Sequence, residues 1–195
     1  MSRRQERRPR TVILLGVSGS GKDTQAKFLR RALPRARIIS TGDSFRTIAR
    51  RKSLVGRYIG GIMQRGGLMP YWAAAHVWLN KFFSELRGDE TVIFTGAPRR
   101  IEEARMLDDV MRDLGRALPE AIYLELTERE AKRRLLNRGR YDDTPRAIAG
   151  RVRFFREHVR PVIRYYRGRG RLITINGDQR VPAVWRDIRK ALRLR

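Results

Sequence analysis

Five short apolar runs alternate with longer amphipathic stretches along the chain. The runs are Thr11–Leu15, Ala36–Ile39, Thr91–Phe94, Ala121–Leu126 and Arg171–Ile175. They are rich in β-branched residues and show no clear alternation of apolar and polar positions, which is typical of strands buried on both faces. The stretches between them have the length of helices. This order predicts an α/β fold, a five-stranded parallel sheet with helices on both faces.

The interval between the second and third runs is long and is predicted to be helical. Residues 42–87 show no strand pattern, and three helices are expected there: Asp43–Arg51, Leu54–Arg65 and Pro70–Leu86. A proline suits the first turn of the third helix. Aromatic residues of that helix recur at roughly helical spacing and are expected in the core: Trp72, Trp78, Phe82 and Phe83. Such an insertion is a good place for a second substrate.

The composition fits one compact domain. The chain has 195 residues, 41% of them hydrophobic, and no apolar run approaches the ~20 residues of a membrane span. The charged N-terminus has no apolar core behind it, so no export signal is expected. The lack of cysteine excludes disulfides and thiolate metal sites, and the two histidines are far apart in the sequence. We therefore expect a cytoplasmic enzyme with no membrane partner.

The charge balance is strongly basic. Lys and Arg number 45 against 20 Asp and Glu, a net charge of +25, and nearly all of the excess is arginine. Residues 1–10 are expected to form a disordered basic tail. Such a charge suits nucleic-acid binding, or an arginine-rich chain whose site needs many arginines. In either case we expect nonspecific polyanion binding at low salt.

A glycine-rich loop carries the clearest chemical signal. Residues 16–24, GVSGSGKDT, follow the first apolar run and precede an amphipathic stretch at Gln25–Leu33. In this strand–loop–helix context the backbone N–H groups point at a polyphosphate, and Lys22 reaches its outer phosphates. The loop departs from the general pattern at Asp23, which stands where a magnesium-binding hydroxyl is expected, and Thr24 follows one place later. The chain is therefore predicted to bind a nucleotide.

Further arginines stand beside glycine, proline and aspartate motifs, just after predicted strands or in predicted loops: Arg46, Arg99, Arg138, Arg140 and Arg151. The carboxyl ends of parallel strands are where open α/β sheets bind ligands. Guanidinium groups stay charged and grip phosphate oxygens bidentately, which suits phosphoryl transfer between two nucleotides. The set predicts a phosphotransferase.

These motifs, taken in order, resemble those of the adenylate kinase family of nucleoside monophosphate kinases, over about residues 12–192. The family's loop G-x-x-G-x-G-K-G-T-Q compares with GVSGSGKDTQ here, which differs at Asp23. Its STGD-x-x-R segment matches residues 40–46. Its G-[FY]-P-R motif matches residues 96–99 except for an alanine, and its R-x-D-D motif matches residues 140–143.

The resemblance implies a P-loop NTPase-type fold in a single kinase domain at residues 11–195. It implies a helical monophosphate-binding insertion at about 41–70 and a very short lid at about 138–143. One glycine separates Arg138 from Arg140, so this lid has no room for zinc.

The resemblance also implies roles for individual residues. ATP would be held by Gly16, Ser18, Gly19, Ser20, Gly21, Lys22, Asp23, Thr24, Arg134 and Arg138. The acceptor monophosphate would be held by Thr41, Arg46, Gly67, Leu68, Met69, Gly96, Arg99, Glu103, Arg140 and Arg151. Catalysis would fall to Lys22, Arg99, Arg138, Arg140 and Arg151, and lid closure to Asp142 and Asp143. Mg²⁺ would bridge the donor phosphates, and the acceptor oxygen would attack directly, without a covalent intermediate.

One departure from the family pattern bears on the metal. Thr95 stands where the family has an aspartate that orients magnesium-bound water. Our hypothesis is that Asp23, with Thr24 beside it, takes over the metal contact. The alternative is that Asp23 only begins the helix, where the helix dipole favours a carboxylate.

A second departure bears on the acceptor base. Glu103 stands where adenylate kinases carry a glutamine that reads adenine, and an ionised carboxylate accepts but does not donate hydrogen bonds. It would suit the N–H edge of guanine, whereas Thr41 is typical of adenylate-specific members. The alternative is that Glu102 and Glu103 form a solvated helix face. AMP is the acceptor we predict.

The predicted function is transfer of the γ-phosphoryl group of ATP to AMP by a monomer. One alternative is a kinase for another monophosphate, such as GMP, CMP or UMP. Another is a nucleotide-binding protein with weak catalysis and a role at RNA or ribosomes. Thr95 and the net charge favour that last alternative, and the transition-state arginines argue against it.

Overall fold

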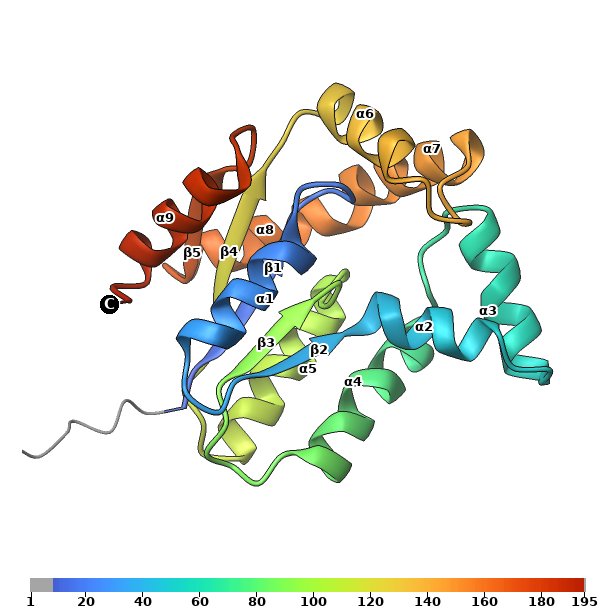
Figure 1. Ribbon diagram of the computed structural model, residues 1–195. Coiled ribbons are helices and arrows are strands. Elements are labelled where there is room, and N and C mark those ends of the chain that lie inside the picture. The colour runs from blue at the N-terminus through green and yellow to red at the C-terminus, as the bar shows by residue number, and fades with distance from the viewer. Residues whose placement is uncertain (1–8, 195) are drawn as a thin grey trace, which may run out of the picture.

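The computed structural model describes residues 9–194 and places a parallel sheet at the centre of the molecule (Figure 1). Within these residues the sheet has five strands: β1 (Thr11–Leu15), β2 (Arg37–Ser40), β3 (Val92–Thr95), β4 (Glu120–Glu125) and β5 (Leu172–Asn176). Their order is β2-β3-β1-β4-β5, and all neighbours are parallel. The predicted fold class is confirmed. Most of the predicted tail at residues 1–10 lies outside the described residues.

Helices cover both faces of the sheet. They are α1 (Lys22–Ala32), α2 (Thr41–Ala49), α3 (Leu54–Gln64), α4 (Tyr71–Glu85), α5 (Ile101–Asp113), α6 (Glu128–Arg138), α7 (Pro145–Phe154), α8 (Arg160–Arg167) and α9 (Val181–Ala191). A π-helical turn, η1 (Phe155–Val159), joins α7 to α8. Helices α1 and α9 pack on one face, and α4, α5 and α8 pack on the other. Within residues 9–194 no helix is long and apolar enough to cross a membrane.

Strand β1 lies at the middle of the sheet and divides the core. Val12 and Leu14 point to the α1 and α9 side, and Ile13 and Leu15 point to the opposite side. All are buried, as predicted. The prediction of burial on both faces is wrong for β2 and β5, which are partly exposed because they lie at the two edges of the sheet.

The insertion between β2 and β3 has a small core of its own. In Figure 1 its helices α2 and α3 project to one side of the sheet. Ser40 Oγ accepts a hydrogen bond from the Asp43 N–H at 3.3 Å, so α2 begins directly after β2. Arg46 therefore lies in α2, inside the helix predicted at Asp43–Arg51. The insertion core consists of Phe45, Ile59, Ile62, Met63, Met69, Ala73, Ala74 and Val77.

The aromatic residues of α4 do not share one environment. Trp78 is buried and Phe82 is half-buried, but Trp72 and Phe83 are 55% and 85% exposed. The prediction of a core position is therefore wrong for Trp72 and Phe83. The reason is rotational: α4 packs inward through small residues such as Ala74, which turns positions 72 and 83 outward.

Candidate active site

The glycine-rich loop between β1 and α1 needs its glycines for both conformation and space. Gly16, Gly19 and Gly21 have φ values of +147°, +90° and +91°, which side-chain-bearing residues rarely adopt. A Cβ on Gly16 would lie 2.8 Å from the carbonyl oxygen of Leu124. Gly21 is also the N-cap of α1, so the loop leads directly into the positive end of that helix. The local sequence thus builds an anion-binding turn.

The Lys22 ammonium is held against this loop. Its Nζ donates to the carbonyl oxygens of Gly16 and Val17, each at 2.8 Å, and to Ser20 Oγ at 3.3 Å. Burial lowers the pKa of Lys22 to about 8; the charge of Asp23 opposes this shift, and those of Arg99 and Arg138 add to it. The site is therefore strongly electropositive around this amine.

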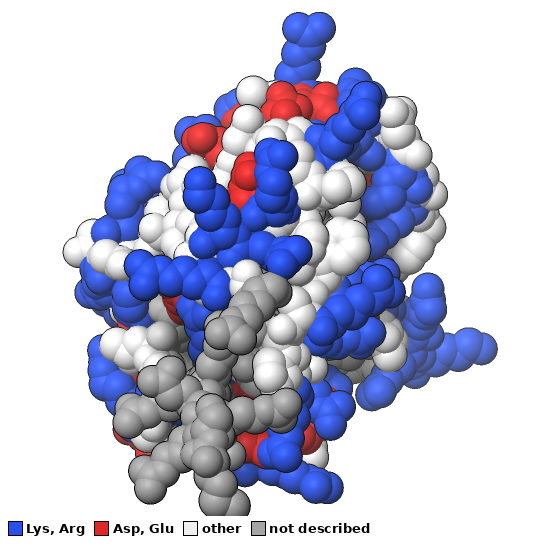
Figure 2. Space-filling model, turned by 60° about the vertical axis from the view of Figure 1, so that its left-hand side comes forward, with Lys and Arg blue, Asp and Glu red and all other residues white. Residues whose placement is uncertain are grey.

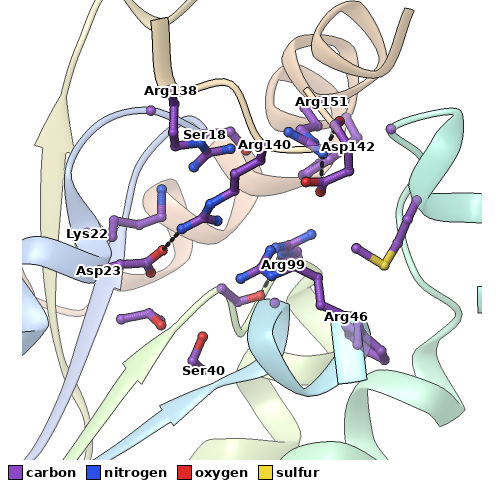
Figure 3. A pocket seen from close by; sticks show the side chains of 18 of the residues that line it. Ser18, Lys22, Asp23, Ser40, Arg46, Arg99, Arg138, Arg140, Asp142 and Arg151 are labelled. Atoms are coloured by element: carbon purple, nitrogen blue, oxygen red, sulfur yellow. Dashed lines mark hydrogen bonds and ion pairs between the residues drawn. The ribbon is translucent and has the colours of Figure 1, made fainter. Parts of the chain in front are cut away.

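A cleft of about 280 Å³ lies between the loop, the insertion, the end of β3 and the α6–α7 connection. Figure 3 shows Lys22, Asp23, Arg99, Arg138 and Arg140 entering it from different elements. Its wall consists of Ser18, Gly19, Gly21, Lys22, Asp23, Thr24, Ser40, Gly42, Phe45, Arg46, Met63, Gly66, Gly67, Met69, Thr95, Gly96, Arg99, Arg134, Arg138, Arg140, Asp142, Arg151 and Phe154. Such a cationic hollow suits a polyanion.

Arg99 is fixed at the carboxyl end of β3. Its Nε donates to the Gly96 carbonyl at 2.6 Å, and its guanidinium carbon lies 5.2 Å from the centre of the Phe154 ring. Gly96 has φ +84°, and a Cβ there would lie 2.7 Å from Thr41 Oγ1. That hydroxyl oxygen is buried without a hydrogen-bond partner among the described residues. Arg99 is thus held rigidly where the acceptor phosphate is predicted to bind.

Glu103 lies behind this wall. It is 1% exposed, and its Oε2 accepts the backbone N–H of Arg99 at 2.9 Å, near the first turn of α5. Burial raises the pKa of Glu103, and the hydrogen bond from Arg99 opposes that shift. The alternative that Glu102 and Glu103 form a solvated helix face is wrong for Glu103, because its side chain folds back onto the backbone. That alternative holds only for Glu102, which is exposed.

The α6–α7 connection is cross-linked by ion pairs. Arg138 Nε and Nη2 donate to Asp143 at 2.8 Å each, and Arg151 donates to Asp142 at 2.6 Å and to Asp143 at 2.5 Å. Burial alone would raise the pKa of Asp143, but the two arginines outweigh it and lower the pKa. Arg138 ends α6 and Arg151 lies in α7, so the predicted loop position is wrong for both. The short connection is therefore tied to both flanking helices by ion pairs.

Two further arginines link separate parts of the site. Arg140 Nη2 lies 3.8 Å from a carboxylate oxygen of Asp23, which connects the α6–α7 connection to the glycine-rich loop. Arg134 Nη1 donates to the Gly177 carbonyl at 3.1 Å, and Arg134 Nη2 lies 3.4 Å from Asp178. Arg134, which lies on the cleft wall, thus contacts the turn between β5 and α9.

Most of the residues singled out in the sequence lie on the wall of this one cleft. Others lie behind or beside it: Gly16, Ser20, Thr41, Leu68, Glu103 and Asp143. Sequence reasoning missed these wall residues: Ser40, Gly42, Phe45, Met63, Gly66 and Phe154. Gly66 had a usable signal in its glycine pair, whereas nothing in the local sequence marks Phe154.

The described residues offer limited protein ligands for a metal. Among residues 9–194 no group of three or more His, Cys, Asp or Glu side chains could hold an ion. Asp23 places a half-exposed carboxylate in the cleft, with Thr24 and Thr95 also on the wall. A hard cation that takes one carboxylate and completes its shell with phosphate oxygens and water fits this donor set.

Comparison with known proteins gives a consistent result. The model of the family described as "Adenylate kinase" matches residues 14–171. An adenylate kinase of Thermus thermophilus is 36% identical over 185 residues, which cover 93% of this chain and 96% of that relative. Adenylate kinase 2 of Nostoc sp. is 35% identical over 184 residues, covering 93% and 97%. An adenylate kinase of Oenococcus oeni is 31% identical over 185 residues, covering 93% and 96%.

Proposed function

The chain belongs to the adenylate kinase family of nucleoside monophosphate kinases, and from that premise we propose that it converts ATP and AMP into two ADP. The observation that carries this proposal is that one lysine and six arginines line the same cleft. Two adjacent polyanions need such a wall to overcome their mutual repulsion. We propose that the chain acts as a monomer.

The donor end of the cleft is formed by the glycine-rich loop. We expect the loop N–H groups and Lys22 to hold the triphosphate, as the positive end of α1 favours anions there. Arg134 contacts the β5–α9 turn, and we propose that it stacks on the donor base. The γ-phosphoryl group would then point toward Arg138 and Arg140.

The acceptor end is formed by the insertion and the end of β3. Arg99, Arg46 and Arg151 would hold the acceptor phosphate, and the Gly67–Met69 backbone with Gly96 would border its base. An oxygen of that phosphate attacks the γ-phosphorus, the bond to the bridging oxygen breaks, and ADP leaves. Arg138 and Arg140 would stabilise the charge on the transferred group.

Magnesium is expected to accompany ATP. The donor set fits it, since Asp23 offers one carboxylate beside the place for the phosphates and Thr24 follows it. When bound, Mg²⁺ would neutralise donor phosphate charge. Within the chain, we propose that Asp23 supplies the carboxylate that Thr95 lacks.

The proposal also specifies which base the acceptor monophosphate carries. Gly96 lies close against Thr41, whereas Oε2 of Glu103 accepts the Arg99 N–H and Glu103 lies off the cleft wall. Because Glu103 lies off the cleft wall and one of its oxygens binds the backbone, it gives no reason to favour guanine. AMP therefore remains the acceptor that we propose.

A coupled phosphotransfer assay tests this proposal. ATP and Mg²⁺ are combined in turn with AMP, GMP, CMP, UMP and dTMP, and we expect turnover with AMP. Arg99→Ala should lose roughly 10²-fold or more in kcat/KM. Arg105→Ala, which removes an exposed arginine of α5 off the cleft wall, is the matched control and should behave like the wild type. Preference for GMP would instead make Glu103 a specificity residue, and no turnover with any acceptor would refute the proposal.

A further inference from the structure

An exposed aromatic pair lies on the insertion, away from the cleft wall. Tyr58 of α3 is 51% exposed and Trp72 of α4 is 55% exposed. Their rings are stacked, with centroids 6.4 Å apart and an interplanar angle of 18°. Leu54, one turn before Tyr58, is 77% exposed. We call the surface formed by Leu54, Arg57, Tyr58 and Trp72 the insertion face.

The insertion face lies in a stretch of chain without negative charge. Between Asp43 and Glu85 the sequence has no acidic residue. Exposed basic residues flank the face in α3 and in the turn before it: Arg50, Arg51, Lys52 and Arg57. Within residues 9–194 none of these four side chains takes part in an ion pair. Their charges are therefore available to an external anion.

Basic charge alone does not distinguish this face. Lys and Arg side chains spread widely over the surface that Figure 2 brings forward, with few Asp or Glu between them. The insertion face is different because a stacked aromatic pair lies among its unpaired cations. This is the combination that binds unpaired bases and the phosphates between them.

We propose that the insertion face binds single-stranded nucleic acid. Bases would stack on Tyr58 and Trp72, while Arg57 and the basic turn would hold the backbone phosphates. A duplex keeps its bases stacked internally and could use only the cations. A second copy of the chain is a poor occupant, because pairing two such faces would bring like charges together.

Fluorescence anisotropy with a labelled oligonucleotide tests the proposal. The full chain is titrated onto single-stranded RNA and DNA of about 15 nucleotides. Excess ATP and AMP are added to fill the cleft. The anisotropy signal then does not arise from an oligonucleotide end that binds in the cleft. Tighter binding of either single strand than of a duplex supports the proposal, and a preference between RNA and DNA shows whether the 2′-hydroxyl is read. We expect a duplex of the same length to bind more weakly.

Matched variants separate stacking from general charge. Tyr58→Ala combined with Trp72→Ala should weaken single-strand binding roughly tenfold or more. Phe83→Ala removes another exposed aromatic residue of α4 and should change the affinity less than about twofold. Trp72→Phe keeps a ring and should retain most of the affinity. Circular dichroism establishes that each variant is folded.

Salt dependence tests the role of the cations. Each phosphate contact contributes a slope of about −0.7 to the plot of log affinity against log salt for single strands. Arg57→Ala should make this slope shallower by about that amount, and Arg105→Ala should leave it unchanged. Three outcomes would overturn the proposal: wild-type affinity in the folded aromatic double variant, equal binding of duplex and single strand, or dimerisation that the double variant abolishes.

Discussion

At the scale of residues, the charge of Lys22 sets an expected pH limit. Burial lowers its pKa to about 8, so the free enzyme loses this charge above that pH. We predict that kcat/KM for ATP falls about tenfold per pH unit above pH 8. In contrast, kcat should persist to higher pH, because bound phosphates raise the pKa of the ammonium. Initial rates measured from pH 6 to 10 at saturating AMP provide the check.

Unfolding would not explain that loss of activity. Because the folded pKa of Lys22 lies below the unfolded value, the unfolded chain binds more protons between about pH 8 and 10.5, and the Lys22 contribution to stability rises with pH there. Asp23→Asn removes a charge that raises the pKa of Lys22. The alkaline limb, which is the fall of kcat/KM at high pH, should therefore move to lower pH. Asp43→Asn, whose carboxylate pairs with Arg46, should leave the limb in place. A limb that stays fixed in Asp23→Asn would assign it to another group.

Glu103 shows the limit of residue-level prediction. Its position in the motif suggested a base-reading side chain, yet whether it reaches the cleft depends on how α5 is rotated and on the Arg99 N–H that it accepts. Phe154 is the opposite case, since it meets Arg99 only through tertiary packing. The glycines of the loop were readable because their backbone requirement is local.

At the scale of elements, α3 and α7 touch through backbone. A Cβ on Gly150 of α7 would lie 2.4 Å from the Arg65 carbonyl oxygen, and one on Gly66 would lie 1.9 Å from the Ala147 carbonyl oxygen. This close approach fixes the insertion, and with it Gly67 on the cleft wall, relative to Arg151. The glycines thus connect the packing of two helices to the geometry of the acceptor end.

Gly150→Ala should therefore be destabilising although alanine favours helices. We predict a lower Tm and a rise of roughly tenfold or more in KM for AMP, because α3 must shift away from α7. Gly60→Ala in α3 is the matched control, since its Cβ would find only ordinary contacts at 3.9 Å. It should gain about 1 kcal/mol, or roughly 2–4 °C in Tm. Thermal melting gives the Tm of each variant, and titration with AMP gives its KM. A higher Tm in Gly150→Ala would contradict the close packing of α7 against the end of α3.

Helices and strands were predicted correctly where the apolar pattern was strong. Prediction failed where the exposure of a residue depends on which elements pack beside it. The strands and the insertion helices were placed from apolar patterns, because burial imposes those patterns. The partial exposure of β2 and β5 depends on strand order, which the apolar runs do not encode. The outward turn of Trp72 depends on which side of α4 meets the insertion core, and the π-helical turn had no local signal.

At the scale of the whole molecule, the net charge of +25 opposes the folded state. Like charges held close together repel, and the ion pairs that offset them are mostly at the surface, where each is worth little. Salt shortens the range of this repulsion from about 30 Å at 0.01 M to about 8 Å at 0.15 M. Screening should therefore relieve more repulsion between arginines than it removes attraction from exposed pairs.

We predict that Tm rises by a few degrees as sodium chloride increases from about 0.01 to 0.15 M. An uncharged solute at equal osmolality is the control and separates screening from general exclusion effects. AMP should add a further rise that Arg99→Ala reduces, because that stabilisation comes from occupancy of the acceptor end of the cleft. A Tm that falls with salt would mean that the cross-linked pairs, such as Arg151 with Asp142, contribute more to stability than the excess charge takes away.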